Sequence, residues 1–75
     1  MTKLRLHYYE CEHEGDLQRH ESDLVDLGVK VHSTNCDPDS ETGVIEIEVP
    51  DLEAFKAQFK TSNASDFCSG MTKLA

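Results

Sequence analysis

The sequence predicts an α+β domain of the ferredoxin-like, split β-α-β type, in which two helices pack on one face of an antiparallel sheet. Three segments alternate apolar and polar residues with a period of two, which is typical of strands with one buried face: Lys3–Tyr9, Val29–Cys36 and Thr42–Val49. Two further segments repeat apolar residues at helical spacing. The order is therefore β-α-β-β-α, with or without a short fourth strand, and the right-handed crossover rule leaves few ways to arrange it.

The three strands define the buried face of the sheet. The five residues Asp37–Glu41 contain proline and acidic side chains, which suit a turn between the second and third strands. We expect Cys36 to pair with Thr42 across this turn and the third strand to lie between the other two. The predicted buried face then consists of Leu4, Leu6, Tyr8, Val29, Val31, Ile45, Ile47 and Val49.

The two helices have recognisable ends. Leu17–Leu27 carries one narrow apolar stripe, and we expect Asp16 to cap its N-terminus and Gly28 to end it in a left-handed conformation. The second helix follows Asp51, a suitable N-cap, and reaches Lys60. It places three apolar residues on one face: Leu52, Phe55 and Phe59.

The last part of the chain carries the weakest signal. Residues 1–65 form the predicted single domain, and residues 66–75 have no steady period. This C-terminal segment is either a short strand or a loose tail. If it does not pair, the first strand keeps a bare edge, and a homodimer through that edge or through the open sheet face becomes an alternative.

The chain is strongly acidic. Fifteen Asp and Glu residues against seven Lys and Arg residues give its 75 residues a formal net charge of −8. This charge repels phosphate backbones, which argues against binding to nucleic acid, and it attracts basic protein surfaces or cations. The alternative is that the charge serves solubility alone. No segment has the length of a membrane span, and no apolar leader precedes the first strand, so we expect no membrane association.

The cysteines indicate a reducing environment. There are three of them, an odd number, and none belongs to a CxxC motif. We therefore expect free thiols and a cytoplasmic location.

Six carboxylates are predicted to gather at one end of the sheet, and we call them the acidic pole. In the predicted topology, the ends of the first and second strands lie at the same edge as the start of the third. The acidic pole consists of Glu10, Glu12, Glu14, Asp37, Asp39 and Glu41. Such a concentration of charge speeds association with a basic partner and makes it sensitive to salt. The alternative is that these are ordinary hydrophilic loops.

One candidate metal site lies on the open face of the sheet. The expected register puts His32 opposite Glu46, and His7 can lie on the other side of the same glutamate. Two imidazoles and a carboxylate suit zinc or iron. The alternative is cross-strand charge pairing, because the same register forms a second row of Arg5, Glu48 and Lys30.

A second candidate metal set lies within the acidic pole. It consists of Cys11, His13 and Cys36, but a C-x-H motif followed by a distant cysteine is a weak metal pattern. The surrounding carboxylates are expected to raise the pKa of the thiols, which hinders thiolate formation.

The sequence contains no arrangement typical of an enzyme. No Gly-rich phosphate loop or Ser, His and acid triad can be placed, Cys68 has no base nearby in sequence, and His20 is expected at the boundary of the core. We therefore expect no catalysis and no cofactor. We predict a small acidic module that binds a protein partner with a basic surface and regulates or inhibits it. Stand-alone acidic domains of this size include virus-encoded accessory proteins, a class suggested by size and charge rather than by any residue. The alternative is a protein that binds a divalent metal through either set above.

Overall fold

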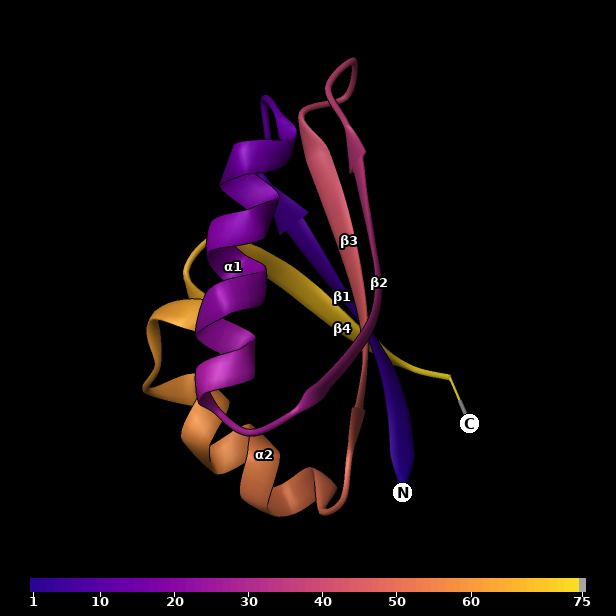
Figure 1. Cartoon of the computed structure of the whole chain (residues 1–75), viewed down its shortest axis with the longest axis vertical. Helices are drawn as coiled ribbons and strands as arrows, with labels where there is room; N and C mark the ends of the chain where they lie inside the picture. Colours follow the sequence, from indigo (N-terminus) through magenta and orange to yellow (C-terminus); the bar gives the residue numbers. More distant parts are fainter. Residues whose placement is uncertain (75) are drawn as a thin grey trace.

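The computed structural model of the chain describes residues 1–74. Its elements are β1 (Thr2–Tyr9), α1 (Glu14–Asp26), β2 (Lys30–Asp37), β3 (Thr42–Val49), α2 (Leu52–Lys60), the 3-10 helix η1 (Asn63–Ser65) and β4 (Cys68–Lys73). The strands form one antiparallel sheet in the order β2-β3-β1-β4. Both helices lie on the same side of this sheet (Figure 1). The predicted α+β class, an antiparallel sheet with two α-helices, is confirmed.

The core lies between the sheet and the helices. All residues of the predicted buried face are buried except Val31, which is half-buried on the edge strand β2. α1 contributes Leu17 and Leu24 to this core, and α2 contributes Phe55 and Phe59. Full burial of one such side chain contributes about 1.5–3 kcal/mol relative to leaving it exposed. The alternating pattern therefore identified the face that holds the molecule together.

The hairpin between β2 and β3 differs from the expected register. Asp37, rather than Cys36, pairs with Thr42. The register then shifts at His32, which is the extra residue of a bulge on β2. Because the bulge cancels the first offset, Lys30 still lies opposite Glu48, as the sequence suggested.

The register between β1 and β3 was predicted wrongly by two residues. Arg5 lies opposite Glu46 and His7 opposite Val44, whereas we expected Arg5 opposite Glu48. A shift of two residues leaves every side chain on its own face of the sheet, so the alternating pattern does not detect it. Side-chain contacts favour the observed register, including an ion pair of 2.9 Å between the Arg5 guanidinium and the Glu46 carboxylate.

The helix ends are partly as expected. The predicted cap at Asp16 is wrong: α1 begins earlier, and its N-cap is His13, whose side chain makes no capping hydrogen bond. Asp51 does cap α2, because its carboxylate accepts hydrogen bonds from two backbone N–H groups of the first turn. Gly28 follows α1 with φ 83°, a left-handed conformation that glycine adopts without a steric penalty.

The C-terminal segment forms a strand. β4 pairs with β1, so β1 lies inside the sheet between β3 and β4. The bare edge of β1 that motivated a homodimer is therefore covered; residue 75 of this segment lies outside the described residues. In the part of the chain that the structure describes, no helix is both long and apolar enough to cross a membrane.

Candidate functional site

Two loops of the acidic pole lie side by side at one end of the sheet (Figure 1). The backbone N–H of Cys11, in the β1–α1 loop, donates to the carbonyl oxygen of Glu41, in the β2–β3 hairpin, with an N···O distance of 2.9 Å. On the other side of Glu10, the N–H of Tyr9 donates to the carbonyl oxygen of Phe67 at 2.9 Å. These two hydrogen bonds hold Glu10 between the hairpin and the segment that precedes β4.

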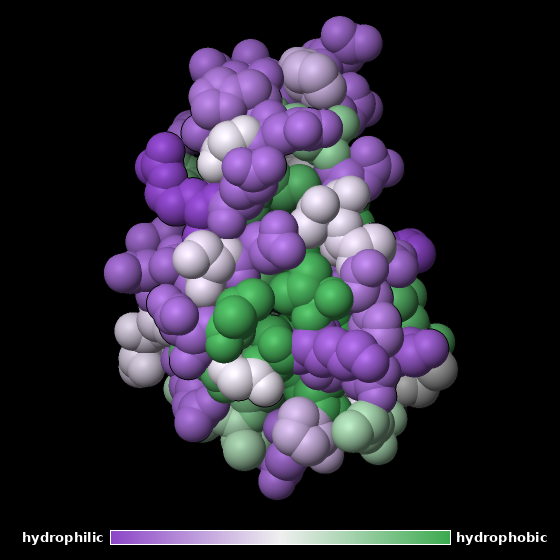
Figure 2. Space-filling model, viewed as in Figure 1, coloured by the Kyte–Doolittle hydropathy of each residue, from purple (hydrophilic) through white to green (hydrophobic). Residues whose placement is uncertain are grey.

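A depression of about 370 Å³ lies between these segments and α1, and we call it the acidic pocket. Its lining includes four carboxylates, from Glu10, Glu12, Asp16 and Glu41. Arg19, His20 and Phe67 complete it. Hydrophilic side chains dominate this end of the molecule, at the top of Figure 2. Since four acidic groups face one guanidinium, the pocket carries an excess of negative charge.

The backbone of the acidic pocket is strained at three positions. Within residues 1–74, the non-glycine residues with positive φ are Glu10 (57°), Glu41 (56°) and Phe67 (63°), and all of them line this pocket. Such a conformation costs on the order of 1 kcal/mol or more for a residue with a Cβ. The two backbone hydrogen bonds that flank Glu10 stabilise it. Strain of this kind concentrates at functional sites, where the surrounding structure maintains it.

His20 forms the wall of the pocket on α1. The residue is only 8% exposed. Its ring stacks on that of Tyr8, with centroids 4.3 Å apart and planes 14° from parallel. The Tyr8 hydroxyl donates to the carbonyl oxygen of Ala64 at 2.7 Å, which fixes the ring on which His20 lies. The imidazole therefore lies between the core and the pocket, at the boundary where the sequence analysis expected it.

One nitrogen of His20 has no partner. Its Nδ1 atom is buried and makes no hydrogen bond within residues 1–74. Burial lowers the pKa of His20 below its ordinary value, and Asp23 offsets this only in part. The ring is therefore neutral at neutral pH, and a neutral imidazole offers one donor and one acceptor.

The carboxylate of Asp16 organises the pocket. One of its oxygens accepts a hydrogen bond from the backbone N–H of Glu12 at 3.1 Å. The other lies 3.9 Å from the Arg19 guanidinium and 3.8 Å from the His13 ring. Asp16 thus holds the loop and balances the charge of Arg19. None of the three glutamates of the pocket forms an ion pair with a residue of the described chain.

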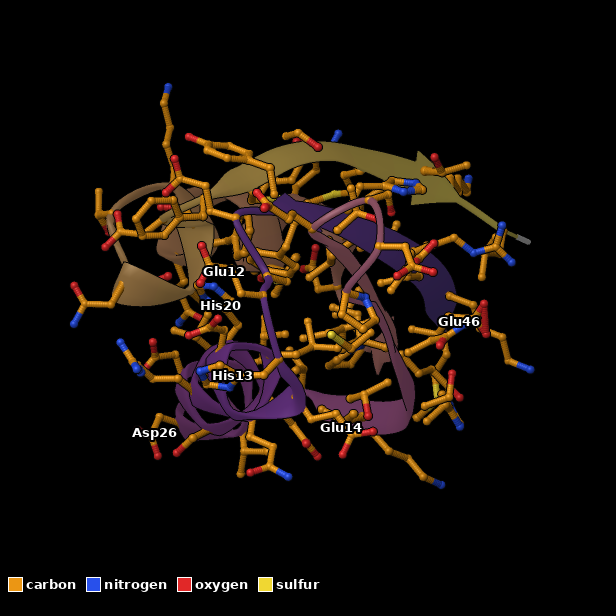
Figure 3. All side chains as sticks on the ribbon, turned by 90° about the horizontal axis from the view of Figure 1, so that it is seen from above. Glu12, His13, Glu14, His20, Asp26 and Glu46 are labelled. Atoms are coloured by element: carbon orange, nitrogen blue, oxygen red, sulfur yellow. The ribbon has the colours of Figure 1, made fainter. Side chains whose placement is uncertain are left out.

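The remaining residues of the acidic pole lie outside the pocket. Asp37 and Asp39 are exposed on the hairpin, where the Asp37 carboxylate accepts from the N–H of Asp39 at 3.2 Å and shapes the turn. Glu14 lines a smaller depression next to β2. Figure 3, which looks onto this end, shows Glu12 and His20 together and Glu14 on a different side of α1. The two loops meet as the topology suggested, but the pocket gathers only half of the acidic pole.

The cysteine and histidine set of the acidic pole does not form a metal centre. Cys11 is fully buried, and the thiol of the half-buried Cys36 donates to its carbonyl oxygen at 3.9 Å. The exposed His13 side chain lies at the start of α1. Burial raises the pKa of Cys11, and Cys36 and Asp16 add to this. Thus the direction of the pKa shift was expected, but desolvation rather than nearby carboxylate is its main cause.

The candidate metal site on the sheet face does not form either, because His7, His32 and Glu46 each contact a different partner. His32 is displaced by the bulge and contacts Glu48, with 2.8 Å between Nε2 and Oε1, and this hydrogen bond lowers the pKa of Glu48. Glu46 is paired with Arg5, and the ring of His7 contacts a threonine hydroxyl of β4 at 3.2 Å. No group of three metal-ligating side chains is close enough to hold an ion within residues 1–74. Cross-strand pairing, the alternative reading, describes this face.

A second depression, of about 410 Å³, lies between α2 and β4, and we call it the lysine groove. Lys56 and Lys60 line it from α2. Its apolar lining comes from Phe59, Cys68 and Met71. The sequence alone does not predict this groove, because the groove forms only when Cys68–Lys73 is a strand.

Sequence reasoning also missed four residues of the acidic pocket. Asp16, Arg19 and His20 have the i, i+3, i+4 spacing that puts side chains on one face of a helix, directly after an acidic loop. That spacing could have identified these three residues as one cluster. No sequence pattern marks Phe67, because it lies in a segment without periodicity and its position depends on a hydrogen bond to β1.

No protein-family model, curated protein or solved structure matches the chain. The chemistry of the acidic pocket is therefore deduced from its own residues.

Proposed function

We propose that the chain is a small non-enzymatic module that binds a basic surface of a protein partner through the acidic pole, and thereby regulates or inhibits that partner. The observation that carries this proposal is the junction of two acidic loops by the hydrogen bond from Cys11 to Glu41. Because backbone atoms make the junction, the acidic residues of both loops remain exposed. Carboxylates assembled in this way repel one another and attract a cationic surface.

The charge of α1 adds to that of the loops. Its first turn carries Glu14 and Asp16, and its last turn carries no basic residue. The acidic first turn lies next to the two loops and therefore extends their negative potential.

The fold and the thiols support a binding role in a reducing compartment. We propose the ferredoxin-like arrangement on the basis of the element order and the strand order β2-β3-β1-β4. This arrangement hosts many activities, so it does not determine one. Burial raises the pKa of Cys11 and Cys68, which lowers the fraction of reactive thiolate. Free thiols of this kind suit the cytoplasm.

The test is a pair of charge-reversal variants. Partners are captured from cell extract with the wild-type chain and identified by mass spectrometry, and the purified partner is then titrated at increasing salt. We expect the double variant Glu12→Lys, Asp39→Lys to weaken binding about tenfold or more, because two attractive charges become repulsive.

The matched control is the double variant Asp26→Lys, Glu53→Lys, which changes the net charge equally at exposed sites outside the acidic pole. We expect a clearly smaller effect, because surface charges act over about 8 Å at physiological ionic strength. Equal weakening by both variants, or an affinity that ignores salt, would overturn the proposal.

A further inference from the structure

We propose that the outer edge of β4 binds an extended, acidic peptide segment of a protein partner as an added strand. In this arrangement the peptide places an apolar side chain in the lysine groove and carboxylates beside the two lysines. The proposal goes beyond the function of the acidic pole, because it assigns a second surface with the opposite charge preference. Three features of the molecule support it: the unpaired backbone of β4, the groove beside it and the charge of that groove.

The backbone of β4 is unpaired on one side. β4 is an outer strand of the sheet, and the N–H of Leu74 donates to the carbonyl oxygen of Lys3 on β1 at 2.8 Å. Hydrogen bonds of an antiparallel pair involve alternate residues, so Thr72 also bonds to β1, while the N–H and C=O groups of Met71 and Lys73 point away from it. In the described part of the chain, neither of these two residues forms a backbone hydrogen bond with a loop or a helix. Their backbone groups therefore offer hydrogen bonds to a further strand.

The two outer strands of the sheet differ in regularity. The ladder of β2 is interrupted by the bulge at His32, and bulges protect an edge from pairing. The irregularity between β1 and β4 lies before Gly70, and the register from there to Lys73 is regular. A Cβ placed at Gly70 would meet nothing within 4 Å, so the strand is accessible at this point. The edge of β4 is therefore the better suited of the two to strand addition.

The lysine groove lies where side chains of an added strand would point. Met71 is opposite the buried Leu6, which places its side chain on the helix side of the sheet, and Phe59 lines the groove from α2. Since strand side chains alternate between the two faces, every second residue of the added strand points to the same side. An apolar residue there would bury its surface against Phe59 and Met71. In strand addition, main-chain hydrogen bonds provide affinity, and contacts of alternate side chains provide specificity.

The charge of the groove determines which peptide fits. Lys56 and Lys60 line it and are exposed, and neither forms an ion pair within residues 1–74. No acidic residue of the described chain lines the groove, although the chain as a whole carries a net charge of −8. Carboxylates of a peptide therefore complement this surface. A second copy of the chain fits less well, because two-fold pairing through β4 would repeat the same lysines on both sides.

The experiment follows the backbone amide signals of the isotope-labelled chain by NMR while the peptide acetyl-Glu-Thr-Leu-Thr-Glu-amide is added. We expect saturable shifts centred on β4 and Phe59. At a peptide concentration ten times the dissociation constant, hydrogen exchange at the amides of Met71 and Lys73 should slow by about tenfold, because exchange then occurs only in the free chain. Thr72, which already bonds to β1, should change less. Contact through side chains alone would not produce this alternation.

Two control peptides separate the contributions of backbone and charge. The first carries N-methyl groups on its three inner residues, which removes the donors that a strand needs, and it should give no saturable shift. The second replaces both glutamates with lysine. Its affinity should be lower by about tenfold or more, because attraction to the groove becomes repulsion.

A pair of double variants tests the lysines. Lys56→Gln, Lys60→Gln should weaken binding of the acidic peptide by about three- to tenfold. The matched control is Lys3→Gln, Lys30→Gln, which changes the net charge equally at exposed lysines outside the groove. Its affinity should stay within about twofold of that of the wild type, because exposed charges at a distance are screened by salt.

A pair of single variants tests the edge itself. Met71→Ala and Met71→Pro both remove the same side chain, but only proline also removes the N–H that points away from β1. Proline is tolerated at such a position of an outer strand. Met71→Pro should bind the acidic peptide at least about fivefold more weakly than Met71→Ala.

Three outcomes would overturn the inference. They are the absence of a saturable shift with the acidic peptide, equal affinity for the N-methylated peptide, and protection of the Met71 amide that rises with the concentration of the chain alone. The last would show that a second copy occupies the edge. The acidic pole is tested separately, because Glu12→Lys, Asp39→Lys should leave affinity for the acidic peptide within about twofold of the wild type.

Discussion

The acidic pocket and the lysine groove have similar volumes, about 370 and 410 Å³, but they are built in different ways. The apolar lining of the groove comes from side chains that belong to the core or pack against it, such as Phe59 and Met71. The acidic pocket is lined by charged loops in unfavourable backbone conformations, with one buried nitrogen unsatisfied. The lysine groove follows from the packing of the core. The acidic pocket reduces stability, and this contrast is the physical reason to look for function there.

The largest difference between the two regions should appear in their phenylalanines. Phe59, which lines the groove, is 8% exposed, whereas Phe67, which lines the pocket, is 46% exposed. Phe59→Ala should lower the free energy of unfolding by about 3–5 kcal/mol, because it opens a cavity in the core. Phe67→Ala should lower it by less than about 1 kcal/mol. Urea denaturation measures both values, and similar losses would show that the pocket is also part of the core.

A second pair of variants compares Gly43, which packs against Cys11 of the β1–α1 loop, with Gly70, which lines the lysine groove. A Cβ at Gly43 would lie 2.6 Å from Leu17 Cδ1 and 3.1 Å from Cys11 Sγ, whereas a Cβ at Gly70 meets nothing within 4 Å. Gly43→Ala should therefore destabilise by about 1–3 kcal/mol through overpacking. Gly70→Ala should change stability by less than about 0.5 kcal/mol. Thermal unfolding of both variants checks this order, and equal losses would show that Leu17 and Cys11 move aside without cost.

The backbone strain of the pocket can be relieved at Glu41. Glycine adopts its φ of 56° without a steric penalty, so Glu41→Gly should raise the free energy of unfolding by about 0.5–1 kcal/mol relative to Glu41→Ala. Both variants lose the same carboxylate, and both should weaken binding to a basic partner. The comparison uses chemical denaturation for stability and the same titration for binding. If glycine were no more stable than alanine, the strain would not be present in solution.

The finest test is the pH dependence contributed by His20. Burial lowers its pKa below the ordinary value of 6.5 in the folded state, so the unfolded chain binds more protons as the pH falls below that value. This contribution to stability is complete above pH 6.5 and is lost as the pH falls through the folded pKa. His20→Phe should remove this part of the slope. Free energies of unfolding measured on either side of pH 6.5 give the slope of stability against pH. An unchanged slope in the variant would show that other groups cause it.

Much of the fold was predictable because local patterns determine it. Alternation identified the strands and their buried face, Asp51 marked the start of α2, and Gly28 marked the end of α1. The predictions that were wrong concern residues whose sequence pattern is compatible with more than one structure. Asp16 has the chemistry of an N-cap, but it lies within the first turn of α1 and holds the preceding loop instead.

Only the negative charge of the candidate site could be predicted from the sequence. The sequence by itself determined that two acidic loops would follow β1 and β2, and the topology brought them to one edge. Only the tertiary structure decided that His20 stacks on Tyr8, that Phe67 closes the pocket, and that β1 is shifted by two residues. The physical reason is the same in each case. A repeat of two residues is unchanged by a shift of two, and a pocket built from distant segments depends on contacts that no single segment encodes.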